Sequence, residues 1–295
     1  MTLPKAKIGK KVSVSAGLHQ IIGALLSHVT TNTAPTLLGD PEALRQMRGA
    51  LRQLRAVFRL FRPLLDPDEG GRFDAPLRQF AQTFGAARDW DVSCLQTLPA
   101  AMSDLPDNDW KDLSALADAK RTTKHAAVQD VVCGPQFTRL ILDLALWAET
   151  RATAPQDIVA KRLAKIAPAL LDKFAEKANR AGRHPGRLSM VALHDFRKAL
   201  DRLNVAIRFL GSTYPASAVA AYRKRGDAVR DIIGAANNAE VTKVLANGLA
   251  TEGSRDLSTS AAVFATWADP GQAHTLTDLK HVARRFRGAS QFWQT

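Results

Sequence analysis

The chain has 295 residues, of which 46% are hydrophobic and 23% charged, so it has the length for two domains and the apolar content for folded cores. Lysine and arginine number 41 against 28 acidic residues, a formal net charge of +13, which attracts polyanions such as nucleic acid, an anionic membrane face or polymeric phosphate. Two cysteines without a C-x-x-C pair exclude a disulfide framework and a thiolate zinc site, and suit the reducing cytoplasm.

The first predicted helix covers residues 14–30. Its longest apolar stretch, Ile21 to Leu26, is far shorter than the roughly 18 residues of a membrane span, so we expect no span. Four lysines before this stretch imitate the start of a signal peptide, but His19 and His28 flank the apolar residues and no clear cleavage site follows. We therefore interpret the segment as the first helix of the fold, with a signal peptide as the alternative.

Three further helices are predicted over residues 41–62, 74–98 and 110–149, the last with a break at Gly134-Pro135. Apolar residues recur at spacings of three and four, whereas alternating β-branched residues and Asn-Gly hairpins are nearly absent. Asp40-Pro41 is typical of a helix start, with a capping side chain followed by a proline in the first turn. The sequence therefore predicts an all-α protein.

The second half of the chain repeats the first, with four counterpart helices after residue 158. A shift of 149 residues places Leu44, Arg48, Ala50, Leu51, Leu54 and Arg59 on Leu193, Arg197, Ala199, Leu200, Leu203 and Arg208. A shift of 145 aligns the first helices, so the second copy carries four extra residues, within 181–186. We expect two pseudo-symmetric four-helix bundles, residues 1–155 and 156–295, with a basic cleft or pore between them.

Arginine recurs along residues 45–62 at a spacing of three or four, which places its members within roughly 100° of the helix circumference. They are Arg45, Arg48, Arg52, Arg55, Arg59 and Arg62. A solvated face is the plain alternative, but we expect no acid among the neighbours of this face, and unrelieved like-charge contacts destabilise a helix. The guanidinium fork binds phosphate oxygens in pairs, so the pattern favours a phosphate-binding face about 25 Å long.

The second copy of this face is less uniform. His194, Arg197 and Arg208 keep it basic, with Lys198 and Arg202 on its flank. Asp201 and Asn204 replace Arg52 and Arg55, and we expect Asp201 to pair with Arg197 one turn earlier. The two basic helices are expected to face each other, so that their fields add.

These residues resemble the CHAD family, a helical domain named for its histidines. The motif His-x-x-Arg followed by basic residues and leucine fits His194, Arg197, Arg202 and Leu203, and Ala-Ala-Arg-Asp-Trp-Asp-Val at 86–92 is similar to a second family segment. The resemblance implies two bundles around a basic cleft that binds inorganic polyphosphate, and association with polyphosphate granules. Arg45 stands where the family has a histidine, which makes that charge permanent.

The predicted function is non-enzymatic binding of inorganic polyphosphate, without a cofactor, a metal or a membrane partner. The predicted ligand-binding residues are Arg45, Arg48, Arg52, Arg55, Arg59, His194, Arg197, Lys198, Arg202 and Arg208. A nucleic-acid-binding adaptor is the first alternative, although no aromatic platform for base stacking is evident. A metal-dependent phosphohydrolase is the second; Asp195 and Asp201 are the acids near the basic faces, and no phosphate loop or paired-histidine motif is present.

Overall fold

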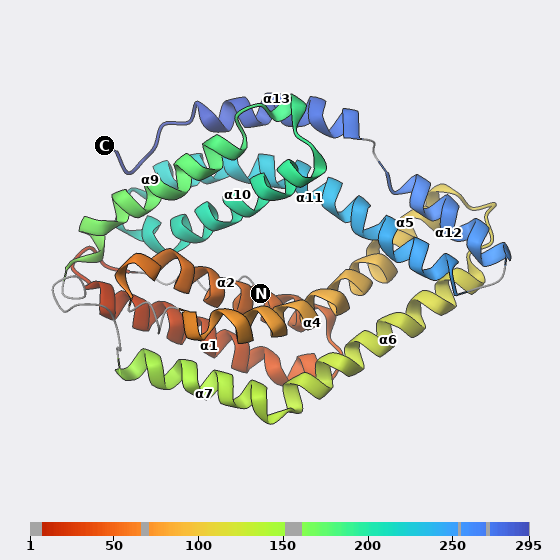
Figure 1. Ribbon diagram of the computed structural model, residues 1–295, viewed down its shortest axis with the longest axis horizontal. Coiled ribbons are helices and arrows are strands. Elements are labelled where there is room, and N and C mark those ends of the chain that lie inside the picture. The colour runs from red at the N-terminus through yellow and green to blue at the C-terminus, as the bar shows by residue number, and fades with distance from the viewer. Residues whose placement is uncertain (1–7, 66–70, 151–160, 253–254, 270–271, 295) are drawn as a thin grey trace.

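The computed structural model describes residues 8–65, 71–150, 161–252, 255–269 and 272–294 (Figure 1). Over the first half of the chain its α-helices are α1 (Val14–Leu37), α2 (Pro41–Phe61), α4 (Asp74–Val92), α5 (Leu98–Asp104), α6 (Lys111–Cys133) and α7 (Pro135–Thr150). Over the second half they are α9 (Leu163–Ala181), α10 (Met190–Leu210), α11 (Ala216–Ala250), α12 (Arg255–Trp267) and α13 (Gln272–Arg287). The predicted all-α fold is confirmed.

Helix α1 continues to Leu37, beyond the end predicted at residue 30. The polar residues after that point usually compete with the helical backbone for hydrogen bonds. Here the Thr30 and Thr33 hydroxyls donate to carbonyls one turn back, both at 3.0 Å, so the helix is not interrupted. It ends before Gly39, whose φ of 82° lies in the left-handed region that glycine adopts readily.

The prediction of one helix over residues 74–98 was wrong in its last turns. Helix α4 ends at Val92 and passes through a π-helical turn, η2 (Ser93–Thr97), into α5. No proline or glycine lies between residues 86 and 97 to signal this change. The break predicted at Gly134 is confirmed, because α6 and α7 meet there at 55°.

No single helix in the described parts of the chain has the length and apolar composition of a membrane span. Only α6 and α7 taken together across their bend would reach that length and composition.

The internal repeat is confirmed by the helix boundaries. Adding 149 to the bounds of α2 gives the bounds of α10, and the same shift carries the 3-10 turn η1 (Arg62–Leu64) onto η4 (Gly211–Thr213). Both helices begin with a capping side chain: Asp40 accepts from the backbone N–H of Glu42, and Ser189 from that of Ala192. The longer loop of the second copy holds the turn η3 (Pro185–Arg187).

The apolar sector of α2 decides which way its arginines point. Met47, Leu51, Leu54, Phe58 and Phe61 are all buried in the larger of two hydrophobic cores. Burial of each such side chain stabilises the fold by about 1.5–3 kcal/mol, so this face is firmly held against α1 and α4. The arginines of the adjoining sector therefore lie outside this core, and one of them, Arg52, reaches Asp201 of α10 in the second half.

Figure 1 shows the helices as an elongated ring, with α2 and α4 along one side and α10 and α11 along the other. At one end Ser13 forms an isolated backbone bridge with Arg162. At the other end α5 and α6 pack with α11 and α12 in a second core that contains Trp110 and Phe264. The boundary predicted between residues 155 and 156 lies outside the described residues, so the division into domains 1–155 and 156–295 stays a prediction.

Candidate anion-binding site

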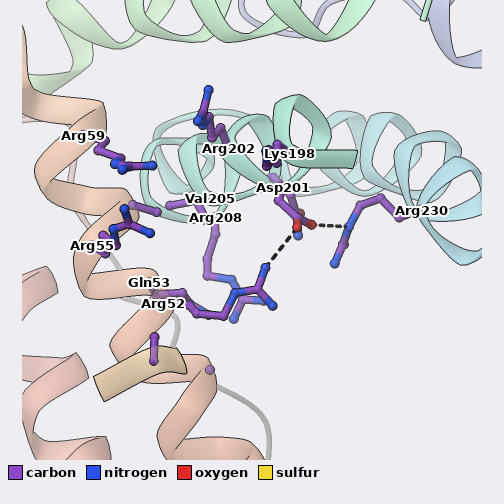
Figure 2. A pocket seen from close by; sticks show the side chains of 14 residues that line it. Arg52, Gln53, Arg55, Arg59, Lys198, Asp201, Arg202, Val205, Arg208 and Arg230 are labelled. Atoms are coloured by element: carbon purple, nitrogen blue, oxygen red, sulfur yellow. Dashed lines mark hydrogen bonds and ion pairs between the residues drawn. The ribbon is translucent and has the colours of Figure 1, made fainter. Parts of the chain in front are cut away.

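A cavity of about 340 Å³ lies where α2 and α10 approach each other, next to α4 and α11 (Figure 2). Among the described residues, its lining contains seven basic side chains and one acidic one, Asp201. The basic residues are Arg52, Arg55 and Arg59 from α2, Lys198, Arg202 and Arg208 from α10, and Arg230 from α11. Both halves of the chain therefore contribute positive charge to one open cavity.

The lining follows the internal repeat. Every lining position pairs with another one 149 residues later: 49 with 198, 52 with 201, 53 with 202, 55 with 204, 56 with 205, 59 with 208, and 81 with 230. Arg52 also contacts its own repeat partner, Asp201, through Nη2 and Oδ2 at 3.1 Å. Two equivalent positions can touch only near the axis that relates the halves, so the cavity lies on that axis.

The structure brings together most, but not all, of the residues predicted to bind the ligand. Arg52, Arg55, Arg59, Lys198, Arg202 and Arg208 line the cavity. Arg45, Arg48, His194 and Arg197 do not. Of these four, Arg45 and His194 are exposed, whereas Arg48 and Arg197 are partly buried and lie close to Arg52 of the lining.

Arg48 and Arg197 form a desolvated basic group with Asp89 of α4. Burial and the neighbouring charge of Arg52 lower the pKa of Arg48 to about 10, and burial also lowers the pKa of Arg197. Arg48 lies against Gly85, with its buried Nε lacking a hydrogen-bond partner. Both guanidinium groups are still charged at neutral pH, so they add to the positive potential of the cavity from behind.

The expectation that no acid lies near the arginines of α2 was wrong. Arg45 forms two hydrogen bonds of 2.6 Å with Glu42 in the first turn of its own helix. Arg55 and Arg59 both bind the carboxylate of Asp74, at the start of α4. The spacing of the arginines within one helix cannot reveal a partner brought in by another helix, and this explains the error for Asp74.

Asp201 pairs differently from the prediction. Instead of forming an ion pair with Arg197, it accepts from Arg52 of α2 and from Nε of Arg230 of α11, the latter at 3.2 Å (Figure 2). Arg230 also binds Asp227 one turn earlier, at 2.9 Å. Asp201 therefore links α2 of the first half to α11 of the second half, within the lining of the cavity.

Arg230 is the basic residue of the described lining that the sequence analysis did not predict. It lies on α11, outside the two helices with a regular basic face. The internal repeat could have indicated it. Ala81 of α4 lines the same cavity, and the residue 149 positions later is Arg230.

The model of the CHAD domain family matches residues 20–247 of the chain. The chain belongs to the CHAD domain family. The crystal structure of the CHAD domain from the plant Ricinus communis is similar over 99% of this chain and 98% of that one, with a TM-score of 0.85 at 22% sequence identity. PptA from Streptomyces chartreusis is similar over 96% of this chain and 100% of that one, with a TM-score of 0.70 at 14% identity. No curated protein matches the chain.

The second family segment of this CHAD domain, residues 86–92, lies on α4 and points its two aspartates in different directions. Asp89 faces the basic group behind the cavity, and burial raises the pKa of its carboxyl. Asp91 is fully buried on another side, where Arg121 Nε and His125 Nε2 of α6 each donate to its Oδ1 at 2.8 Å. Asp91 therefore ties α4 to α6.

Within the described part of this CHAD domain, no three histidine, cysteine or acidic side chains are grouped so as to hold a metal ion. The two acids of the second basic face are engaged with basic partners. Asp201 bridges two arginines, and Asp195 lies 3.5 Å from Nζ of Lys198. Their carboxylates neutralise cations of α2, α10 and α11.

Proposed function

We propose that this CHAD domain binds inorganic polyphosphate in the cavity between α2 and α10, without chemical conversion of the ligand. The observation that carries the proposal is the cavity itself, where seven basic side chains from both halves of the chain surround the symmetry axis. The family membership adds to this reading, because the resemblance already implied polyphosphate as the ligand.

The charge balance of the cavity favours an anionic ligand. Among the described residues, Asp74, Asp195 and Asp227 form ion pairs with cations of the lining from outside it, beside Asp201 within it. These ion pairs set four carboxylates against seven cations, an excess of three positive charges. Such an excess in a partly desolvated space is relieved when an anion binds.

A polymer fits the arrangement of the cations better than a compact anion does. Arg52, Arg55 and Arg59 follow one another along α2, and Arg202 and Arg208 follow one another along α10. A chain of phosphates offers each of these residues a separate pair of oxygens, and guanidinium groups bind phosphate in this bidentate way.

Among the described residues that line the cavity there is no aromatic side chain. Stacking on aromatic rings supplies much of the affinity of proteins that bind single-stranded nucleic acid. This composition supports polyphosphate over the nucleic-acid-binding adaptor considered above.

The test compares ligands and matched variants in one binding assay. Fluorescence anisotropy of labelled long-chain polyphosphate measures affinity, with duplex DNA and RNA as competitors at equal phosphate concentration. We expect polyphosphate to bind, its affinity to fall steeply with salt, and the competitors to displace it poorly. Displacement by DNA or RNA at equal phosphate concentration would contradict selective binding of polyphosphate.

Arg202→Glu tests the place of binding, with Arg139→Glu on the outer helix α7 as the control of equal charge. Arg202 lines the cavity, whereas Arg139 is exposed and does not. A charge-assisted hydrogen bond is worth about 1.5–3 kcal/mol, so Arg202→Glu should weaken binding at least about tenfold. Equal effects of the two substitutions would indicate that polyphosphate binds outside this cavity.

We also propose that the protein lies in the cytoplasm, associated with polyphosphate granules. A fluorescent fusion expressed in cells that accumulate polyphosphate should label the granules, and the Arg202→Glu fusion should be diffuse. Granule labelling by the Arg202→Glu fusion would show that localisation does not depend on binding in this cavity.

A further inference from the structure

We infer that Asp201 makes the cavity selective for a polymeric phosphate over a single phosphate ion. The inference rests on the proposed function, because it assigns a specificity-determining residue to the same site. Asp201 does so by occupying, with its own carboxylate, the position at the centre of the cavity that a small anion would take.

The position of Asp201 follows from the repeat. Its counterpart in the first half is Arg52, and the two residues contact each other near the axis. A cavity with the same residue at both positions would place two arginines face to face there. Asp201 substitutes a negative charge for one of them, which changes the local charge by two and draws the remaining arginines together.

Small anions bind best where two guanidinium groups converge on one point, and the arginines that line the cavity form two such places, one in the lining at Asp201 and one beside it at Asp74. Arg52 and Arg230 converge on Asp201, and Arg55 and Arg59 converge on Asp74. In each place the protein supplies the anion itself. A single phosphate must therefore displace a carboxylate to gain two arginines.

The two carboxylates are held to different degrees. Asp74 accepts four hydrogen bonds of 2.9–3.2 Å, two from each arginine. The hydrogen bond from Arg55 is the main reason that the pKa of Asp74 is lowered to about 2. Asp201 accepts only one hydrogen bond from Arg52 and one from Arg230 among the described residues, half as many as Asp74. An anion can therefore replace the carboxylate of Asp201 more easily than that of Asp74, and removal of Asp201 frees the position between Arg52 and Arg230.

A polymer does not need that position. Its phosphates reach Arg55 and Arg59 through Nη1 on one wall, since Nε and Nη2 of both bind Asp74, and they reach Arg202 and Arg208 on the other wall. Each further contact on the same chain adds affinity through effective concentration. Asp201 therefore weakens the binding of a small anion more than that of a long one. The ratio of the two affinities is the quantity that Asp201 controls.

The experiment compares Asp201→Asn with Asp231→Asn, which removes the same charge from an exposed position of α11 that does not line the cavity. Isothermal titration calorimetry in a low-salt buffer, free of phosphate and sulfate, measures the binding of orthophosphate and of long-chain polyphosphate to each variant and to the unsubstituted protein. Asp201→Asn should bind orthophosphate about tenfold more tightly than Asp231→Asn does, since two arginines lose their internal partner. Its affinity for polyphosphate should rise by a smaller factor.

Equal affinities of Asp201→Asn and Asp231→Asn for orthophosphate would overturn the inference, as would an equal gain for both ligands. Asp201→Glu keeps the carboxylate and should retain the discrimination of the unsubstituted protein, which separates the effect of charge from a change of fold. Failure of every variant to bind polyphosphate would refute the proposed function and, with it, the selectivity for a polymer. The orthophosphate comparison would then still show whether Asp201 excludes a single phosphate.

Discussion

Replacement of Arg48 by methionine should stabilise the protein without ligand and weaken its binding of polyphosphate. Arg48 is charged, largely desolvated and close to Arg52 and Arg197, and its Nε has no hydrogen-bond partner. Methionine keeps an unbranched side chain in the same space and forms helices about as readily as arginine. The substitution therefore removes an unfavourable charge with little change in packing.

The size of the effect follows from the pKa of Arg48. A value of about 10, compared with about 12.5 for a solvated arginine, corresponds to roughly 3 kcal/mol of penalty on the charged form. Removal of the charge would relieve this penalty, but part of the stability gained is lost, because Asp89 also loses one of the cations that favour its carboxylate. We expect a net increase of about 1–2 kcal/mol in the free energy of unfolding.

Urea unfolding followed by far-ultraviolet circular dichroism, at low salt and neutral pH, measures this free energy. Arg52→Met is the matched control, because Arg52 is exposed and paired with Asp201. Loss of that pair should lower the stability by at most about 1 kcal/mol. With saturating polyphosphate the order should reverse, since the ligand stabilises the unsubstituted protein more. A lower stability of Arg48→Met without ligand would refute the reasoning.

Three further predictions concern the packing and the ion pairs of the fold. Asp91→Ala leaves the buried partners on α6 without their carboxylate and should destabilise the fold by about 3–5 kcal/mol in urea unfolding; a loss below 1 kcal/mol would contradict this role. Gly182→Ala would place a Cβ 2.4 Å from the ring of Phe196, so the unfolding temperature should fall by an amount equivalent to about 1–3 kcal/mol, whereas Gly23→Ala, with open space around it, should raise stability slightly. Because the pKa of Asp74 is lowered to about 2 by its arginine partners, its contribution to stability is complete above pH 4 and is lost as the pH falls toward 2; acid unfolding of Asp74→Asn should depend less on pH in this range.

Local signals carried the prediction of the helices. The apolar spacing and the caps at Asp40 and Ser189 depend on neighbours within one or two turns, and α2 and α10 begin directly after those residues. The repeat then added information over long range, because an exact shift of 149 implies an axis between the halves. The π-helical turn at 93–97 has no such local marker, and the prediction missed it.

The candidate site was predictable as a pair of basic helices but not as a set of contacts. Six of the ten predicted residues line the cavity, since helical spacing sets which of them share a face. Their partners depend on how helices from separate parts of the chain meet. Asp74 lies 19 residues from Arg55, and Asp201 lies 149 residues from Arg52. Only the folded chain shows that these acids neutralise part of the basic faces.

The contacts between the two halves at each end of the ring bear on how fast the protein binds its ligand. At one end Ser13 pairs with Arg162, and Ile8 exchanges two hydrogen bonds with the Ser212 hydroxyl. At the other end the edge of Trp110 packs against Phe264, with the ring centres 6.3 Å apart. Because contacts at both ends hold the two halves together, we expect the spacing of α2 and α10 to change little when a ligand binds. Capture should thus be a single-step encounter, with little loss of chain entropy and a rate governed by long-range attraction between opposite charges.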